Sequence, residues 1–350
     1  MEDLFEIVGT KSLDSNAIEF SKFGINFIGR TFDNNGIQGK IQKRNFEPNE
    51  PFSITATVIG NYKYVKFQTE PYYCSQNINK LTPKSIIKIW NEKVAYYLIV
   101  SIQKFVSLYD KQQGGYKLDD IKKHEIQLPT KNNKLDFDLM QNCISELEIK
   151  RLKEIKSYLV LTNLKEYTLT TEEKLVLENF KDKEFEEFSV LKIFDVKNTK
   201  NILSRDIVEN SGETPYLCAS AENNAISSYI SYDEKYLDKG NCVFIGGKTF
   251  VVSYQEKDFY SNDSHNLALY SKNVECNKLN QLYLATCINK SLGYKYSWGD
   301  SISNKKIQSD KVSLPIKNDK PDFETMETFL SAILKLVIKD VVLYVNKKLE

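Results

Sequence analysis

The sequence predicts a mixed α/β (α+β) protein made by tandem duplication, in which each copy is a strand-rich domain followed by a long helix. The thirteen residues LPTKNNKLDFDLM, at 128–140, return as LPIKNDKPDFETM at 314–326, with eight identical positions. At the same spacing of 186 residues, Tyr97 meets Tyr283 and Tyr158 meets Tyr344. A constant spacing over this length indicates a duplication, and two copies are too few for a solenoid of stacked repeats.

Composition is that of an ordinary soluble protein. The 350 residues are enough for two separate cores, and 41% hydrophobic with 27% charged residues is typical of globular chains. The net charge of +1 gives no overall signal for nucleic acid. The six cysteines form no C-x-x-C pair and the N-terminus shows no signal peptide, so we expect reduced thiols in a cytoplasmic protein. The most apolar stretch, 85–105, is interrupted by Lys88, Glu92 and Lys93 and does not predict a membrane span.

Each copy begins with short alternating strands. The pattern predicts strands at 25–32, 52–60 and 62–69 in copy one, and at 214–220, 242–247 and 248–254 in copy two. A helical pattern follows in each copy, around 93–105 and 279–293. Phe5 opens one copy and Phe188 the other, and small loop insertions shift the spacing in between. We predict strand-rich domains at 1–133 and 186–319, long helices at 134–162 and 320–350, and a connector at 163–185.

The long helices have recognisable starts and an apolar seam. Asp136 and Asp322 stand where an N-cap belongs, and Thr170-Thr171 predicts the start of a short helix in the connector. Apolar residues spaced by about 3.5 favour an antiparallel coiled coil of the two long helices, while packing of each helix on its own domain remains the alternative. The seam residues are Met140, Ile144, Leu147 and Ile155 in copy one, and Met326, Leu330, Ile333, Val337, Val341 and Tyr344 in copy two.

No residue pattern predicts catalysis. CVFIGGKT, at 242–249, lacks the first glycine of a phosphate loop and precedes a strand, so Gly246-Gly247 is better read as a hairpin turn. The only two histidines, His124 and His265, are not repeated, and no group has the spacing of zinc ligands. We therefore expect no catalytic residue, no metal and no cofactor in this chain.

The order of domains and helices resembles the DNA-specificity (S) subunit of Type I restriction-modification systems, or the closely similar BcgI-like Type IIB/IIG specificity subunit. GETPYLCASAENNAISSYI, at 212–230, resembles the opening of a recognition domain of that family. KTFVVSYQEKDFYSNDSHNLAL, at 248–269, resembles its central hairpin and following strand, and the LP-x-K-N-x-x-x-DF-x-x-M element also occurs there. The resemblance covers the whole chain, although the chain is short for a Type I subunit and starts directly at a recognition domain.

The resemblance implies a non-catalytic subunit with two target-recognition domains that reads a bipartite double-stranded DNA target. Methyltransferase subunits, fused to or joined by nuclease subunits in some systems, would dock on it and carry S-adenosylmethionine. A two-domain protein-binding scaffold assembled through the coiled coil, without DNA binding, is the alternative. Base reading needs hydrogen-bonding side chains on loops, with lysines near phosphates. The candidates for DNA contact are Arg30, Asn34, Asn35, Lys63, Tyr73, Asn223, Asn224, Lys248, Tyr260, Ser264, His265, Lys305 and Lys306.

Overall fold

The computed structural model describes residues 1–112, 114–274 and 276–350. The chain divides into two compact units, residues 1–155 with Leu349 and residues 156–348 with Glu350, and each unit holds one copy of the repeat. Within the described residues, no helix combines the length and apolar character that crossing a membrane requires.

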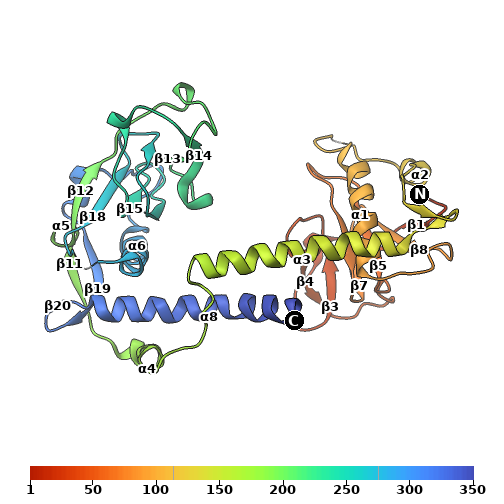
Figure 1. The fold of residues 1–350 in the computed structure, drawn as a ribbon, viewed down its shortest axis with the longest axis horizontal. Coiled ribbons are helices and arrows are strands. Elements are labelled where there is room, and N and C mark those ends of the chain that lie inside the picture. Colours follow the sequence, from red (N-terminus) through yellow and green to blue (C-terminus); the bar gives the residue numbers. More distant parts are fainter. Residues whose placement is uncertain (113, 275) are drawn as a thin grey trace. The chain divides into compact units, whose positions relative to one another are not determined.

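Copy one consists of two four-stranded sheets with helices packed on the first (Figure 1). The first sheet is antiparallel, in the order β1 (Phe5–Gly9), β8 (Ile78–Pro83), β5 (Ser53–Thr57), β6 (Val65–Gln68). The second has the order β2 (Ser12–Leu13), β7 (Tyr72–Ser75), β3 (Ile25–Ile28), β4 (Ile37–Ile41), with β7 parallel to both neighbours. Helix α1 (Glu92–Ser107) packs on β5 and β6, and α2 (Leu118–Lys123) packs on β1. The main core lies between the first sheet and these helices.

Copy two repeats this plan. Its antiparallel sheet has the order β12 (Phe194–Asn198), β18 (Leu267–Ser271), β15 (Cys242–Ile245), β16 (Val252–Gln255), covered by α6 (Lys278–Leu292). A smaller sheet has the order β14 (Ile226–Ile230), β13 (Thr214–Leu217), β17 (Tyr260–Ser261). A third sheet of β11 (Phe185–Ser189), β19 (Lys311–Lys317) and β20 (Lys320–Pro321) joins the domain to its long helix, and α5 (Val190–Ile193) and α7 (Asn304–Ile307) are single turns. Each predicted strand overlaps one strand of the structure, which is shorter than predicted, and the hairpin turn after β15 is confirmed.

The repeated thirteen-residue motif is a small hairpin that leads into a helix. In copy one, β9 (Thr130–Lys131) and β10 (Lys134–Leu135) precede α3 (Phe137–Leu161); in copy two, β19 and β20 precede α8 (Phe323–Leu349). The predicted N-caps are confirmed, because Asp136 accepts the N–H of Leu139 at 3.0 Å and Asp322 accepts that of Thr325 at 3.0 Å. One local structure was therefore used twice, and the motif marks where each strand-rich domain ends and its long helix begins.

The buried line of each long helix differs from the predicted seam. Met140 and Met326 are buried as predicted, but Val337 is 71% exposed while Val342 and Val345 are buried. Two adjacent apolar rows run along α8, and the sequence alone does not show which of them is covered. The correction concerns five predicted seam residues, which are exposed: Leu147 and Ile155 in α3, and Val337, Val341 and Tyr344 in α8. The predicted Ile144, Leu330 and Ile333 are half-buried, and the pairing of the two helices stays a prediction.

The register of the two copies also needs a correction at their first residues. Phe194, not Phe188, opens the first strand of copy two and corresponds to Phe5. The Met1 ammonium donates to the carbonyl of His124, and the Val190 N–H donates to the equivalent carbonyl of Asp310. Residues 185–189, which form β11, therefore lie before the position that corresponds to Met1.

The connector packs on α8 through a buried carboxylate. Helix α4 (Thr171–Asn179) begins at the predicted Thr170 cap, and Glu173 closes a capping box with it. The same carboxylate accepts hydrogen bonds from Ser331 at 2.7 Å and Lys335 at 2.9 Å. Burial opposes ionisation, but these hydrogen bonds prevail and hold the pKa of Glu173 below its usual value.

Replacing Glu173 with alanine should destabilise the second unit. The change removes the capping box and leaves half-buried donors without an acceptor, so we expect the free energy of unfolding to fall by about 1–3 kcal/mol. Because the pKa of Glu173 is depressed in the folded state, this contribution is present at neutral pH and should be lost as the pH falls from the ordinary glutamate pKa through the lowered one. Glu172→Ala, an exposed neighbour in the same turn, is the control in denaturant titrations. Equal losses for both variants would contradict the assignment.

Candidate nucleic-acid interface

Three of the predicted DNA-contact residues lie together in copy two. Lys248 stands in the turn between β15 and β16, and Ser264 and His265 stand in the loop between β17 and β18. Asp263 joins the two loops, because its carboxylate lies 2.9 Å from the Lys248 ammonium and 2.7 Å from His265 Nδ1. It also accepts the backbone N–H of His265 at 2.9 Å. No sequence pattern indicates this role for Asp263.

Asp263 stays ionised throughout the physiological pH range. Partial burial opposes its charge, but the hydrogen bonds from His265 and Lys248 prevail and lower its pKa to about 2. A lysine ammonium has three donors, so Lys248 keeps donors for a further acceptor after binding Asp263. The pair thus presents an oriented cation and an imidazole at the end of a rigid sheet, which suits contact with phosphate or base edges.

Backbone packing fixes these loops against each other. The Gly247 N–H donates to the Asn266 side chain at 2.9 Å, and a Cβ at Gly247 would lie 2.3 Å from the His265 carbonyl oxygen. Only glycine fits at such a close approach. Asn198 donates to the Ser264 carbonyl at 2.8 Å and accepts from Asn304 at 3.1 Å, which links this loop to α7.

Helix α7 carries the last two predicted lysines. Lys306 is bound to the Asp300 carboxylate and donates to the Ser301 carbonyl at 2.8 Å. Lys305 is exposed, and within residues 1–112, 114–274 and 276–350 its ammonium has no ion-pair partner. Lys305 is therefore the freer of the two for a phosphate contact.

Three predicted contact residues are buried, and their assignment to DNA is corrected. Lys63 is only 1% exposed, and its ammonium donates to the carbonyls of Gly60 and Tyr109. Tyr73 and Tyr260 are equivalent core residues whose hydroxyls donate to the carbonyls of Phe46 at 2.7 Å and Tyr232 at 2.8 Å. In each case a polar side-chain end satisfies a loop carbonyl inside the domain, which sequence patterns do not distinguish from an exposed reader.

The asparagine pairs serve the backbone. Asn34, Asn35, Asn223 and Asn224 all have positive φ, a conformation that asparagine tolerates well. The amide of Asn34 donates to Ile37 and that of Asn223 to Ile226, at 3.1 and 3.0 Å, which closes each turn on itself. These four residues are exposed, but their side-chain amides donate hydrogen bonds to backbone carbonyls of the protein.

The predicted Arg30 lies in copy one near exposed aromatic side chains that the sequence analysis missed. Arg30 follows β3 and is exposed. Phe20, Phe23 and Phe32 are exposed around β3 and β4, and Lys66 lies 4.3 Å from the Phe32 ring centre. Exposed aromatic rings near cations can contact sugars or bases. Strand periodicity does not reveal them, because they lie on loops.

The structure contains two domains with the same fold, and each is followed in the chain by a long helix. Polar side chains stand on their loops, which is typical of a protein with two recognition domains. The family model for the Type I restriction modification DNA specificity domain matches residues 1–157 and again residues 182–343. The chain belongs to this family: it is a specificity subunit of a restriction-modification system, with two recognition domains.

Known relatives span nearly the whole chain. The Type II restriction enzyme BgcI specificity subunit S.BcgI of Heyndrickxia coagulans is 24% identical over 349 residues, covering 97% of this chain and 94% of that protein. The crystal structure of a Type-I restriction-modification system S subunit from M. genitalium has a TM-score of 0.61 at 15% identity, covering 99% of this chain and 90% of the other. At 15% identity, the similarity to the M. genitalium subunit is a similarity of fold.

Replacing Lys248 or Lys305 with alanine should weaken DNA binding by the assembled complex. Each loss of one phosphate contact should reduce the slope of log affinity against log salt by about 0.9. Lys63→Met is the contrasting variant, because it removes the donors of two buried carbonyls and should cost about 1–3 kcal/mol of stability. Its DNA affinity, measured on the folded fraction by fluorescence anisotropy, should stay unchanged. A salt slope lowered by Lys63→Met alone would reverse the assignment.

Proposed function

We propose that the chain reads a bipartite double-stranded DNA target, one block with each recognition domain, and brings methyltransferase subunits to it without catalysing a reaction itself. The observation that carries this proposal is the duplication of one complete recognition domain within a single chain. Two sequence readers on one polypeptide are of use where two DNA blocks have to be recognised together.

The two domains differ at the loops where reading would take place. In copy two, the turn after β15 carries Lys248 on the surface, held by Asp263. In copy one, the turn after β5 is longer and folds its lysine, Lys63, into the domain. Since DNA specificity depends on the side chains that reach base edges, the two blocks should have unlike sequences.

The helices suggest the spacing between the blocks. Helix α3 has 25 residues and α8 has 27. At 1.5 Å per residue, each spans about 40 Å. One turn of B-DNA is about 34–36 Å. If the helices set the distance between the two readers, the centres of the blocks lie roughly one turn apart, with an unread gap between them.

Chemistry in this proposal belongs to the partner. Methylation of a base needs a pocket for S-adenosylmethionine and for a flipped nucleotide, which a methyltransferase subunit supplies. A nuclease activity, fused to or joined with that subunit, would turn the complex into a restriction enzyme. The complex would act in the cytoplasm, on double-stranded DNA.

Methylation mapping tests the target directly. Long-read sequencing of DNA modified by the assembled complex should show two unlike blocks of a few base pairs and a gap of fixed length. Exchanging residues 1–133 for another recognition domain should change one block only, because each domain reads alone. A single uninterrupted palindrome in the map would be incompatible with two readers.

The isolated chain should neither methylate nor cut DNA. Incubation with labelled S-adenosylmethionine and genomic DNA should give no incorporation above background, and plasmid substrates should remain intact. The same assays with the methyltransferase subunit added provide the positive control. Incorporation by the chain alone would show that it carries a catalytic site.

A further inference from the structure

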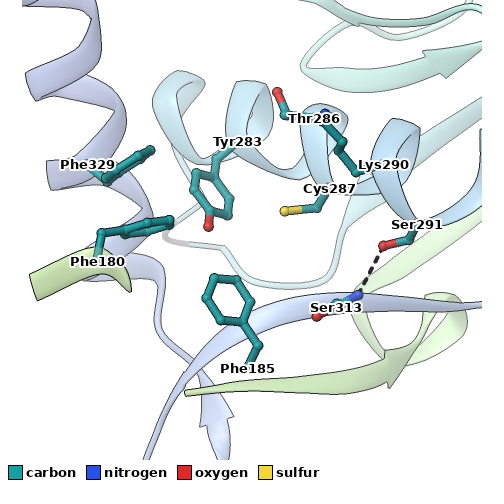
Figure 2. Close-up of a pocket in the computed structure, with 9 residues that line it drawn as sticks. All are labelled: Phe180, Phe185, Tyr283, Thr286, Cys287, Lys290, Ser291, Ser313 and Phe329. Atoms are coloured by element: carbon teal, nitrogen blue, oxygen red, sulfur yellow. Dashed lines mark hydrogen bonds between the residues drawn. The ribbon is translucent and has the colours of Figure 1, made fainter. Parts of the chain in front are cut away.

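Copy two contains a groove between α6 and α8 (Figure 2). The segment that precedes the domain covers one side of this groove with Phe180 and Phe185. Phe180 stacks on Phe329 of α8 with ring centres 3.7 Å apart, and Phe185 meets Phe180 edge-on at 5.9 Å. Tyr283 of α6 meets Phe329 at 6.3 Å. Two aromatic rings from the segment that precedes the recognition domain thus form one wall of this groove.

The same segment adds a strand and a cation. Strand β11 pairs with β19, and the β19 residues Val312 and Leu314 are 0% exposed. The Lys183 ammonium lies 2.6 Å from Asp322, the N-cap of α8, and helps to hold the pKa of that carboxyl below its usual value against the effect of burial. Residues 180–189 therefore supply aromatic rings, a lysine and a strand to one site.

Copy one has the equivalent groove, between α1 and α3, without such a cover. Its walls include Tyr97 and Lys104, which correspond to Tyr283 and Lys290, together with Val100 and Leu147. Val100 and Leu147 are 53% and 51% exposed. The groove of copy one, with apolar and charged residues in its walls, thus lacks the chain segment that lines its counterpart.

The strand edge at residues 125–128 and the helix N-cap Asp136 of copy one also lack the partners that their counterparts have in copy two, within the described residues. Ile126 and Leu128, the counterparts of Val312 and Leu314, are only half-buried. Within the part of the chain that the structure describes, the backbone groups of residues 125–128 make no hydrogen bond and Asp136 has no ion-pair partner. Each of the three features that residues 180–189 satisfy in copy two is available in copy one.

We propose that the groove of copy one binds an extended segment of the methyltransferase subunit. This inference rests on the proposed function. The segment adds a strand along residues 125–128, sets an aromatic side chain against Tyr97, and brings a lysine to Asp136. Strand addition to an open sheet edge is a recurrent mode of peptide recognition, with the backbone giving affinity and side-chain pockets giving selectivity.

A second copy of this chain is a poorer occupant. Its own segment 180–189 is already paired with its β19. To donate that segment, the second copy would have to expose its Val312 and Leu314 and leave Asp322 without its lysine. A segment of another protein can bind without breaking these contacts of residues 180–189.

Hydrogen–deuterium exchange tests the site on the full chain. We expect the amides of residues 126–128 to exchange at least tenfold more slowly in the complex with the methyltransferase subunit than in the free chain. Unchanged exchange at these amides in a formed complex would overturn the proposal. Protection that depends on chain concentration without the methyltransferase, with a doubled mass in light scattering, would point to a second copy and overturn it too.

Variants of the exposed groove residues provide an independent measurement. Val100→Glu and Leu147→Glu should weaken assembly with the methyltransferase subunit at least tenfold, measured by calorimetry. Leu108→Glu is the matched control, because Leu108 is 67% exposed just after α1 and does not line the groove. Thermal unfolding of the free chains verifies that all three remain folded. Equal effects of the groove and control variants would contradict the proposal.

The outcomes separate this inference from the proposed function. If the complex forms and methylates a bipartite target while the groove variants assemble normally, the docking site is wrong and the function stands. If no complex forms with the wild-type chain, both fail together.

Discussion

An exchange of side-chain amides holds the two sheets of each recognition domain together. In copy one, the Asn35 amide donates to the Phe67 carbonyl at 2.8 Å, and the Gln68 amide donates back to the Asn35 carbonyl at 3.3 Å. Copy two repeats it with Asn224 and Gln255. Each exchange ties the turn before β4 or β14 to the edge strand of the other sheet, β6 or β16. Because the loops that would read DNA extend from both sheets, their relative positions depend on this contact.

The sequence was sufficient for much of the fold, because strong local rules determine it. Strand alternation and the Asp136 and Asp322 caps depend on neighbouring residues, and the repeat is visible when the sequence is aligned with itself. The site was harder to predict, since Lys63 and Asn35 have the same residue types as DNA contacts but satisfy the protein's own carbonyls. Burial decides between these uses, and burial depends on tertiary packing. The seam was missed by about one residue in α8 for the same reason.

The spacing between the copies shows where they have diverged. The spacing is 189 residues at Asn35 and Asn224, which precede the β5–β6 and β15–β16 hairpins. It is 187 at Gln68 and Gln255, which end these hairpins. From α1 and α6 onwards it is 186. The first change falls in the turn that carries Lys63 in one copy and Lys248 in the other. Length thus varies at a surface loop while the amide exchange behind it is kept, as expected if the loop is selected for reading and the scaffold for shape.

The balance of charge bears on how such a subunit would discriminate between sequences. Non-specific affinity for DNA grows with the number of phosphates neutralised, but this chain has 48 basic and 47 acidic residues. Asp263 further restrains Lys248 and His265, which fixes their direction and offsets part of the charge of Lys248. A nearly neutral protein with oriented donors has little affinity for a wrong DNA sequence, because attraction to the phosphates alone is too weak to hold the protein on that sequence. In the proposed function, most of the affinity would therefore come from the assembled complex, while this chain supplies the difference between one sequence and another.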